Sequence, residues 1–201
     1  MKESKEQILL TSLKLFMQKS FKEVTMKEIV EKTGLSKGAF YHYFNSKEQV
    51  FAEVIAHFFT GMMTINYSLL PQHSLKAFYG GILGRFEENK KASQKLLTGQ
   101  GEGIINDNYY YLIFDAMRML PDFRQNQQLE QKVELKAWKT VIASAKTNAE
   151  IKTPMADEQV AKLFIYLGDG TNINLVMNNL VNEKKNELKT LWDGLYNSLK
   201  A

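Results

Sequence analysis

The sequence contains no cysteine and only three histidines. The absence of cysteine excludes disulfide bonds, zinc fingers and cysteine nucleophiles, and it is compatible with a reducing compartment. His42, His57 and His73 share no spacing typical of a metal site or a catalytic triad. Phosphate-binding loops, dinucleotide glycine motifs, HExxH motifs and nucleophile elbows are also missing. The sequence therefore predicts a protein that is not an enzyme and that holds no cofactor and no metal.

Long apolar runs are missing as well. The first residues, MKESKEQ, lack the apolar core of a signal peptide, and no later segment is apolar enough to span a bilayer. The formal charge of +4 and the pI near 9.0 are only mildly basic, so affinity for nucleic acid has to come from a localised patch. We expect a soluble cytoplasmic protein without a membrane partner.

Residues 25–47, TMKEIVEKTGLSKGAFYHYFNSK, are the most informative stretch. Thr25 followed by Glu28 forms a capping box, which predicts the start of a helix. Gly34 fits the position after the helix end, because glycine adopts the left-handed conformation without steric cost. Ser36 can then cap a second helix. Two short helices joined by a glycine turn are the layout of a helix-turn-helix DNA reader.

The second of these helices has one buried and one polar side. Phe40 and Phe44, spaced i and i+4, predict the buried side. The other side presents Lys37, Tyr41, His42 and Tyr43, with no acidic residue before Glu48. Lys47 begins the next helix, where a cation opposes the helix dipole, and this suggests an anion such as a phosphate as its contact.

Two other interpretations fit part of this pattern. Tyrosines at helical spacing are often half-buried packing residues, and short helix-turn-helix units occur in proteins that never touch DNA. A helical adaptor could use its aromatic faces for protein contacts alone. The surface from Lys37 to Lys47 argues against an adaptor, because an adaptor does not need an acid-free face with a lysine at each end.

The segment resembles the N-terminal domain of TetR/AcrR-type bacterial transcriptional regulators. The resemblance runs from about Ile8 to Phe59 and departs from the family at Ser20 and Val30, where glycine and a small alanine are common. The residues that carry it are Ile8, Leu13, Phe16, Phe21, Val24, Thr25, Ile29, Thr33, Gly34, Leu35, Ser36, Gly38, Phe40, Tyr41, Tyr43, Phe44, Ser46 and Lys47.

The resemblance implies a set of DNA-binding residues. Thr25 and Lys47 are expected to contact phosphates, together with Tyr41. Gly38 lets the backbone approach DNA closely, and Lys37 is the candidate for a base edge, since a lysine can donate to guanine. The full implied set is Thr25, Ser36, Lys37, Gly38, Tyr41, His42, Tyr43 and Lys47.

The rest of the chain predicts helices throughout, so the expected fold is all-α. No β-alternation, internal repeat or low-complexity tract occurs. We expect a helix-turn-helix domain at 1–47, a linking helix that starts within 46–66, and a larger helical ligand-binding and dimerisation domain at 48–201. The glycine-rich residues 99–108 predict a break in the helices.

The last two predicted helices suggest a homodimer. Each helix has an apolar stripe. Gly168 and Gly170 lie within the first helix, where each glycine destabilises the helix by about 1 kcal/mol relative to alanine. Close packing of another helix would explain that cost, and the pattern resembles the dimer interface of the TetR family, although two ordinary core helices remain an alternative. The predicted interface residues are Val160, Phe164, Leu167, Gly170, Leu188, Leu191, Trp192 and Leu195.

Large aromatic and methionine side chains in the middle region suggest a pocket for an apolar or aromatic small molecule. The predicted pocket residues, which could equally be core, are Phe59, Met62, Tyr110, Tyr111, Phe114, Met117 and Trp138. Together these features predict a dimeric transcriptional regulator, more in keeping with a repressor than an activator, that binds a palindromic operator in double-stranded DNA and is released by a ligand.

Overall fold

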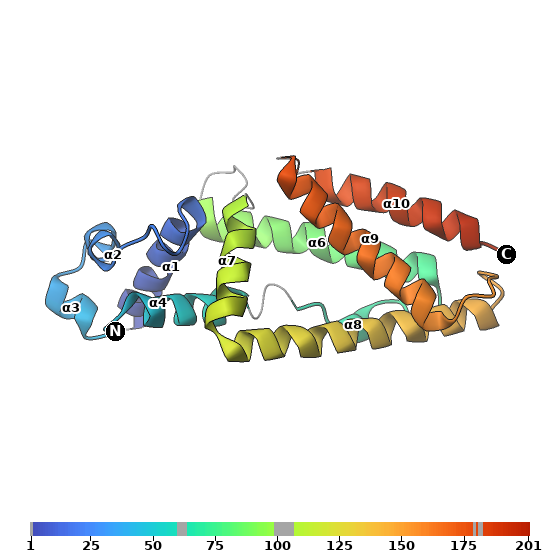
Figure 1. Ribbon diagram of the computed structural model, residues 1–201, viewed down its shortest axis with the longest axis horizontal. Helices are drawn as coiled ribbons and strands as arrows, with labels where there is room; N and C mark the ends of the chain where they lie inside the picture. The colour runs from blue at the N-terminus through green and yellow to red at the C-terminus, as the bar shows by residue number, and fades with distance from the viewer. Residues whose placement is uncertain (1, 60–63, 99–106, 179, 181–182) are drawn as a thin grey trace. The chain divides into compact units, whose positions relative to one another are not determined.

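The computed structural model describes residues 2–59, 64–98, 107–178, 180 and 183–201, with side chains described within 4–59, 64–92, 110–178, 180 and 183–201. The elements are α1 (Lys2–Gln18), α2 (Met26–Thr33), α3 (Lys37–Tyr41), α4 (Lys47–Val54), η1 (Ile55–Phe59), η2 (Tyr67–Leu69), α6 (Leu75–Thr98), α7 (Asp107–Met119), α8 (Pro121–Thr147), α9 (Asp157–Met177) and α10 (Lys184–Leu199) (Figure 1). An isolated bridge between Ile151 and Lys200 is the one strand-type pairing in the described part. The all-α prediction is confirmed.

The chain forms two compact units. The first comprises Met1–Thr64 and Ser93–Gln125, and the second comprises Ile65–Ala92 and Asn126–Ala201. Helices α6 and α8 each contribute residues to both units. This division does not follow the expected boundary at residue 47, because α4 packs against α1 and belongs to the same unit.

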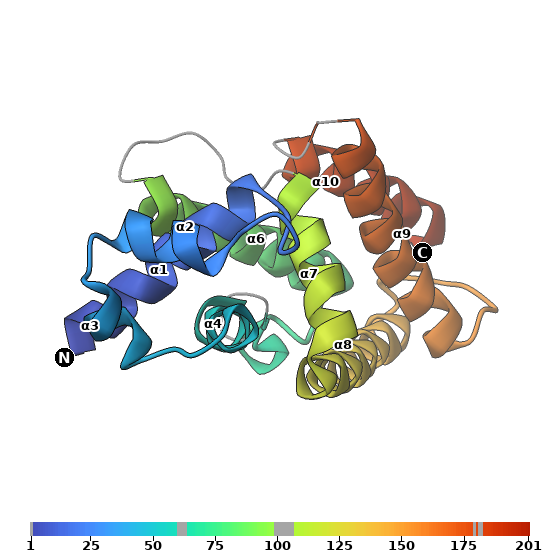
Figure 2. The ribbon, with the colours of Figure 1, turned by 60° about the vertical axis from the view of Figure 1, so that its left-hand side comes forward.

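Helices α1 and α4 pack against each other in the first unit (Figure 2). The core of this unit is rich in phenylalanine. The ring of Phe51 lies edge-on to Phe16 and Phe21, with centroid distances of 5.4 and 4.7 Å. Phe40 and Phe44, from α3 and the turn after it, are fully buried in the same core. Such edge-to-face contacts add roughly 0.5–1.5 kcal/mol each to the burial of apolar area.

The helix after Lys47 is not regular along its predicted length. It is an α-helix up to Val54 and then becomes a π-helical turn, Ile55–Phe59. Residues 60–63, which include the candidate Met62, lie outside the described part of the chain. Isolated π turns are uncommon and often accompany functional sites.

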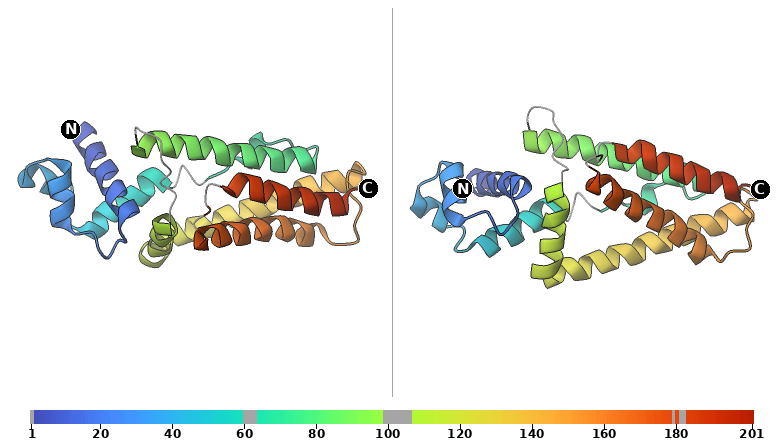
Figure 3. Two further views of the ribbon diagram at one scale, coloured as in Figure 1. Left: turned by 90° about the horizontal axis from the view of Figure 1, so that it is seen from above. Right: turned by 45° about the horizontal axis from the view of Figure 1, so that its top comes forward.

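The second unit has Trp138 at the centre of its core. The Trp138 ring stacks on Phe164 at 4.9 Å and meets Phe78 and Trp192 edge-on at 5.1 and 5.4 Å. These four side chains come from α8, α9, α6 and α10, so one tryptophan joins all four helices. Helices α9 and α10 lie side by side in both views of Figure 3.

A carboxylate distant in sequence caps α6. Glu150 accepts hydrogen bonds from the Ser74 hydroxyl and from the backbone N–H groups of Leu75 and Lys76, at 2.9–3.1 Å. Partial burial opposes ionisation, but these three donors stabilise the charged form and hold the pKa of Glu150 below its usual value. The cap satisfies N–H groups that a helix leaves unpaired at its start.

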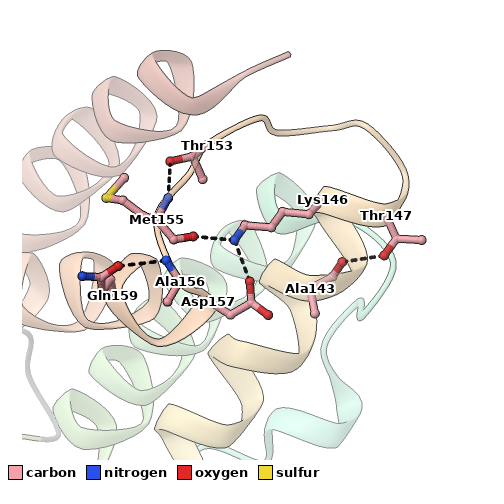
Figure 4. A network of polar contacts seen from close by, with 8 residues as sticks. All are labelled: Ala143, Lys146, Thr147, Thr153, Met155, Ala156, Asp157 and Gln159. Atoms are coloured by element: carbon pink, nitrogen blue, oxygen red, sulfur yellow. Dashed lines mark hydrogen bonds and ion pairs between the residues drawn. The ribbon is translucent and has the colours of Figure 1, made fainter.

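The connection from α8 to α9 is held by polar contacts (Figure 4). Lys146 donates to the Met155 carbonyl oxygen at 2.6 Å and forms an ion pair with Asp157 at 2.7 Å. The Gln159 side chain accepts from the N–H of Ala156, and α9 therefore begins at Asp157. The Thr153 hydroxyl accepts from the N–H of Met155, so it caps only a local turn before α9.

Candidate nucleic-acid interface

Helix α2 has the boundaries that its sequence predicts. The Thr25 hydroxyl accepts a hydrogen bond from the N–H of Glu28 at 3.2 Å. Gly34 ends the helix with φ +68°, in the left-handed region, and its N–H donates to the Glu31 carbonyl oxygen. Both devices are local, so they fix where the turn before α3 begins.

Helix α3 is a short helix of five residues. The Ser36 hydroxyl accepts from the N–H of Ala39 at 3.3 Å and starts it, and His42 follows its last residue. Phe40 is completely buried, which fixes how the helix is rotated about its axis. Ser36 therefore has a demonstrable role as a helix cap.

Most of the predicted DNA-binding residues are exposed. Tyr41 keeps 45% of its surface accessible, although it is a large aromatic residue. Tyr43 differs, because it is half-buried and packs against the core of the first unit. The exposed members of the set are Thr25, Ser36, Lys37, Gly38, Tyr41 and His42.

The acidic residue in the first turn of α2 is neutralised. Glu28 forms an ion pair with Lys19 at 2.6 Å. Exposed pairs of this kind contribute little stability, but they cancel charge locally. Helix α3 itself contains no acidic residue, so its surface presents Lys37 without a neighbouring carboxylate on the same helix.

Lys47 has a role that the sequence did not reveal. Its ammonium group donates to the backbone carbonyl oxygens of Phe21 and Val24, at 2.8 and 2.7 Å, and lies 4.3 Å from the centroid of the Phe21 ring. Lys47 thus holds the segment between α1 and α2 against α4. An ammonium group has three donors, so one remains for a phosphate.

Four predicted interface residues are core residues, which corrects that part of the prediction. Val160, Phe164, Leu188 and Trp192 are at most 3% exposed within a single chain, so a second copy cannot reach them. The Trp192 indole N–H donates to the Phe164 carbonyl oxygen at 2.9 Å, which holds α10 against α9. The remaining candidates keep some accessible surface: Leu167, Leu191 and Leu195 are half-buried, and Gly170 is exposed.

Helix α9 exposes a second apolar stripe that the sequence reasoning missed. It consists of Leu163, Tyr166, Ile173 and Met177, which are 40–78% exposed, and Gly170 lies within it. A side-chain carbon built at Gly170 would meet no atom within 4 Å, whereas one at Gly168 would touch Trp192 at 3.6 Å. Packing inside the chain thus accounts for Gly168 and leaves Gly170 without a close neighbour.

The predicted pocket residues fall into both units. Phe59 is buried in the core of the first unit and Trp138 in that of the second. On α7, Tyr110 and Met117 are half-buried, while Tyr111 and Phe114 are each 59% exposed. Of the predicted break at 99–108, residues 99–106 lie outside the described part of the chain, so the break stays a prediction.

The helix-turn-helix segment matches a known family. Residues 8–54 match the model of the N-terminal domain of bacterial regulatory proteins of the tetR family. Over these residues the chain is similar to the tetR family. It is 34% identical over 125 residues to the HTH-type transcriptional regulator YerO of Bacillus subtilis (strain 168), a match that covers 56% of this chain and 42% of YerO. The HTH-type regulator YdgC of the same organism is 36% identical over 73 residues, covering 36% of this chain and 37% of YdgC. The chain therefore aligns with less than half the length of these relatives.

Solved structures of tetR-family regulators share the fold over nearly the whole chain. NalD, the secondary repressor of the MexAB-OprM multidrug efflux pump in Pseudomonas aeruginosa, aligns with a TM-score of 0.61 at 15% identity, covering 99% of this chain and 98% of NalD. Reduced NemR of E. coli aligns with a TM-score of 0.58 at 19% identity, covering 94% and 95%. Among the described residues of this chain, no helix is both long and apolar enough to cross a bilayer.

Proposed function

We propose that this protein is a DNA-binding transcriptional regulator, and that α3 enters the major groove of an operator. The observation that carries the proposal is the exposed surface of Lys37, Gly38, Tyr41 and His42 on a helix whose rotation is fixed by buried Phe40. Thr25 and Lys47 flank this surface, with free donor capacity for phosphates. Phosphate contacts set the register, and contacts to base edges set the sequence preference.

Two substitutions test this proposal. Lys37→Ala should relax the preference at particular base pairs by about 1–3 kcal/mol if the lysine reads a base edge. Lys14→Ala, which removes the same charge from an exposed position of α1, is the matched control and should leave that preference unchanged. The measurement is fluorescence anisotropy on selected genomic duplexes at several salt concentrations.

The contrary outcome favours the adaptor interpretation. If the wild-type chain shows no salt-dependent retention on any duplex at moderate salt, α3 does not read DNA. A partner protein would then be the candidate for the exposed aromatic surface.

We further propose that the regulator acts as a homodimer through the exposed stripe of α9. The support is the combination of four exposed apolar side chains with an open glycine at their centre, because close helix packing suits a position without a side chain. Two recognition helices in a dimer would have to lie roughly 34–36 Å apart to occupy successive major grooves. A palindromic operator follows from two-fold symmetry.

Release by a small molecule completes the proposed mechanism, with repression as the expected mode. A ligand that prefers a dimer whose recognition helices have a different separation lowers affinity for the operator, and the operator must weaken ligand binding by the same factor. The family resemblance and the many aromatic side chains of the second unit support an effector with an apolar or aromatic body.

A further inference from the structure

Polar groups meet around Glu134, beside the apolar core of the second unit. Glu134 lies on α8, one turn before Trp138, and the hydroxyl of Tyr67 from η2 is close enough to bear on its ionisation. The carboxyl group of Asp169, from α9, is near enough to repel it. Tyr67 is 9% exposed and its ring stacks on Phe78 at 6.2 Å, so aromatic surface borders the cluster.

The indole N–H of Trp138 lacks an acceptor. Trp138 is fully buried, and its Nε1 forms no hydrogen bond with any described residue. The N–H is near enough to Glu134 to favour the ionised carboxylate, but it forms no hydrogen bond with it. A buried donor without a partner costs about 1–3 kcal/mol, and a bound oxygen atom would remove that cost.

Glu134 also lacks a cation. None of the ion pairs among the described side chains includes it. The nearby Lys184 on α10 instead stabilises the charged form of Asp169, and its ammonium group lies 4.1 Å from the centroid of the Phe86 ring. Burial, reinforced by the charge of Asp169, raises the pKa of Glu134 above its usual value. A carboxylate in such surroundings is stabilised by an opposite charge brought to it from outside the chain.

We propose that Glu134 and Trp138 bind an organic cation that carries an acceptor oxygen beside its ammonium group, as an aromatic amino alcohol does. The ammonium group pairs with the Glu134 carboxylate, and the oxygen accepts from the Trp138 indole N–H. Residues one helical turn apart have Cβ atoms roughly 5–6 Å from each other, which suits two adjacent functional groups of one small molecule. The site rests on the proposed function, since it gives the effector of the second unit a chemical class.

A series of four matched probes tests the two contacts. The probes are 2-amino-1-phenylethanol, 2-phenylethylamine, 2-phenylethanol and phenylacetate, which differ in the ammonium and the oxygen but share the aromatic ring. The full chain contains two tryptophans, and binding is followed by their fluorescence and by thermal shift. The amino alcohol should bind most tightly, phenylethylamine more weakly, and the neutral and anionic probes at least tenfold more weakly than the amino alcohol.

Variants assign the contacts to their residues. Glu134→Gln should weaken the amino alcohol at least tenfold, while Glu187→Gln, at an exposed position of α10, should leave its affinity unchanged. Trp138→Phe removes the N–H and should abolish the advantage of the amino alcohol over phenylethylamine. If Trp138→Phe does not fold, the same comparison of the two amines in the wild-type chain decides whether the oxygen contributes.

The proposal is overturned by any of three results. These are equal binding of the neutral or anionic probe, unchanged binding in Glu134→Gln, and no binding of either amine to the full chain at millimolar concentration. Operator binding is measured separately, without probes. If the chain binds the amines but not DNA, the proposed regulatory function is refuted and the proposed cation site stands. If it binds DNA but not the amines, the cation site is refuted and the regulatory function stands.

Discussion

At the scale of single residues, the sequence predicted the contacts that are local in the chain. Thr25, Gly34 and Ser36 act through hydrogen bonds or backbone angles within four residues, and the sequence predicted each of them. The hydrogen bonds from Lys47 to the carbonyl oxygens of Val24 and Phe21 could not be predicted in this way, because these two residues lie 23 and 26 positions earlier in the chain. A charge pattern indicates that a lysine is available, but only the fold shows what already holds it.

Gly38 offers a test in which stability and function move in opposite directions. The Cβ atom added by Gly38→Ala would meet no atom within 4 Å. The substitution should therefore stabilise the chain by up to about 1 kcal/mol, because alanine has the higher helix propensity. It should also weaken operator binding, because the added methyl group stands where the backbone would approach DNA. Thermal unfolding and duplex titration measure the two effects.

Gly80→Ala is the control for Gly38→Ala. Gly80 lies on α6, is exposed, and also has no atom within 4 Å of an added carbon. It should stabilise the chain in the same way without affecting DNA binding. Operator affinity unchanged in Gly38→Ala would show that the backbone of α3 does not come close to DNA.

At the scale of the element, α9 shows why one sequence cannot assign a face. Both sides of this helix are apolar, since buried Val160 and Phe164 oppose exposed Tyr166 and Ile173. Periodicity indicates a helix in either case, but it does not tell which stripe meets the chain's own core. The structure assigns the faces because Trp138 and Trp192 fill the space beside Phe164.

The start of α6 gives a pH-dependent prediction. Glu150→Gln should destabilise the second unit by about 1 kcal/mol near neutral pH, as loss of a helix cap does. The pKa of Glu150 is lower in the folded chain than its usual value, so its stabilising effect is present above that usual value and is lost as the pH falls through the folded pKa.

Chemical denaturation at several pH values measures this effect. The difference in unfolding free energy between the wild type and Glu150→Gln should shrink below about pH 4, where the carboxylate becomes protonated. Glu183→Gln, at an exposed position before α10, should show no such difference. A difference independent of pH would mean that the charge of Glu150 does not contribute to the cap.

At the scale of the whole molecule, the proposed dimer has a direct test. Ile173→Glu places a charge in the middle of the exposed α9 stripe, and burying it unpaired between two chains would be costly. Sedimentation should show a monomer, and operator affinity should fall because the two half-sites are no longer bound together.

Gln131→Glu is the matched control for this substitution. Gln131 is exposed on α8, on the side of the helix opposite Val133, and the change adds the same charge. This variant should remain dimeric with full operator affinity. A wild-type chain that sediments as a monomer at micromolar concentration would contradict the proposed assembly.

The contact between Glu150 and α6 has a consequence for the order of synthesis. The N-terminus of α6 is translated about 75 residues before the carboxylate that caps it. Trp192, which completes the same core, is translated later still. Because domains fold as units while the chain emerges, the core of the second unit stays incomplete until α10 has been translated. A nascent chain stalled before α10 would expose Trp138 and should depend on chaperones in a way that the finished protein does not.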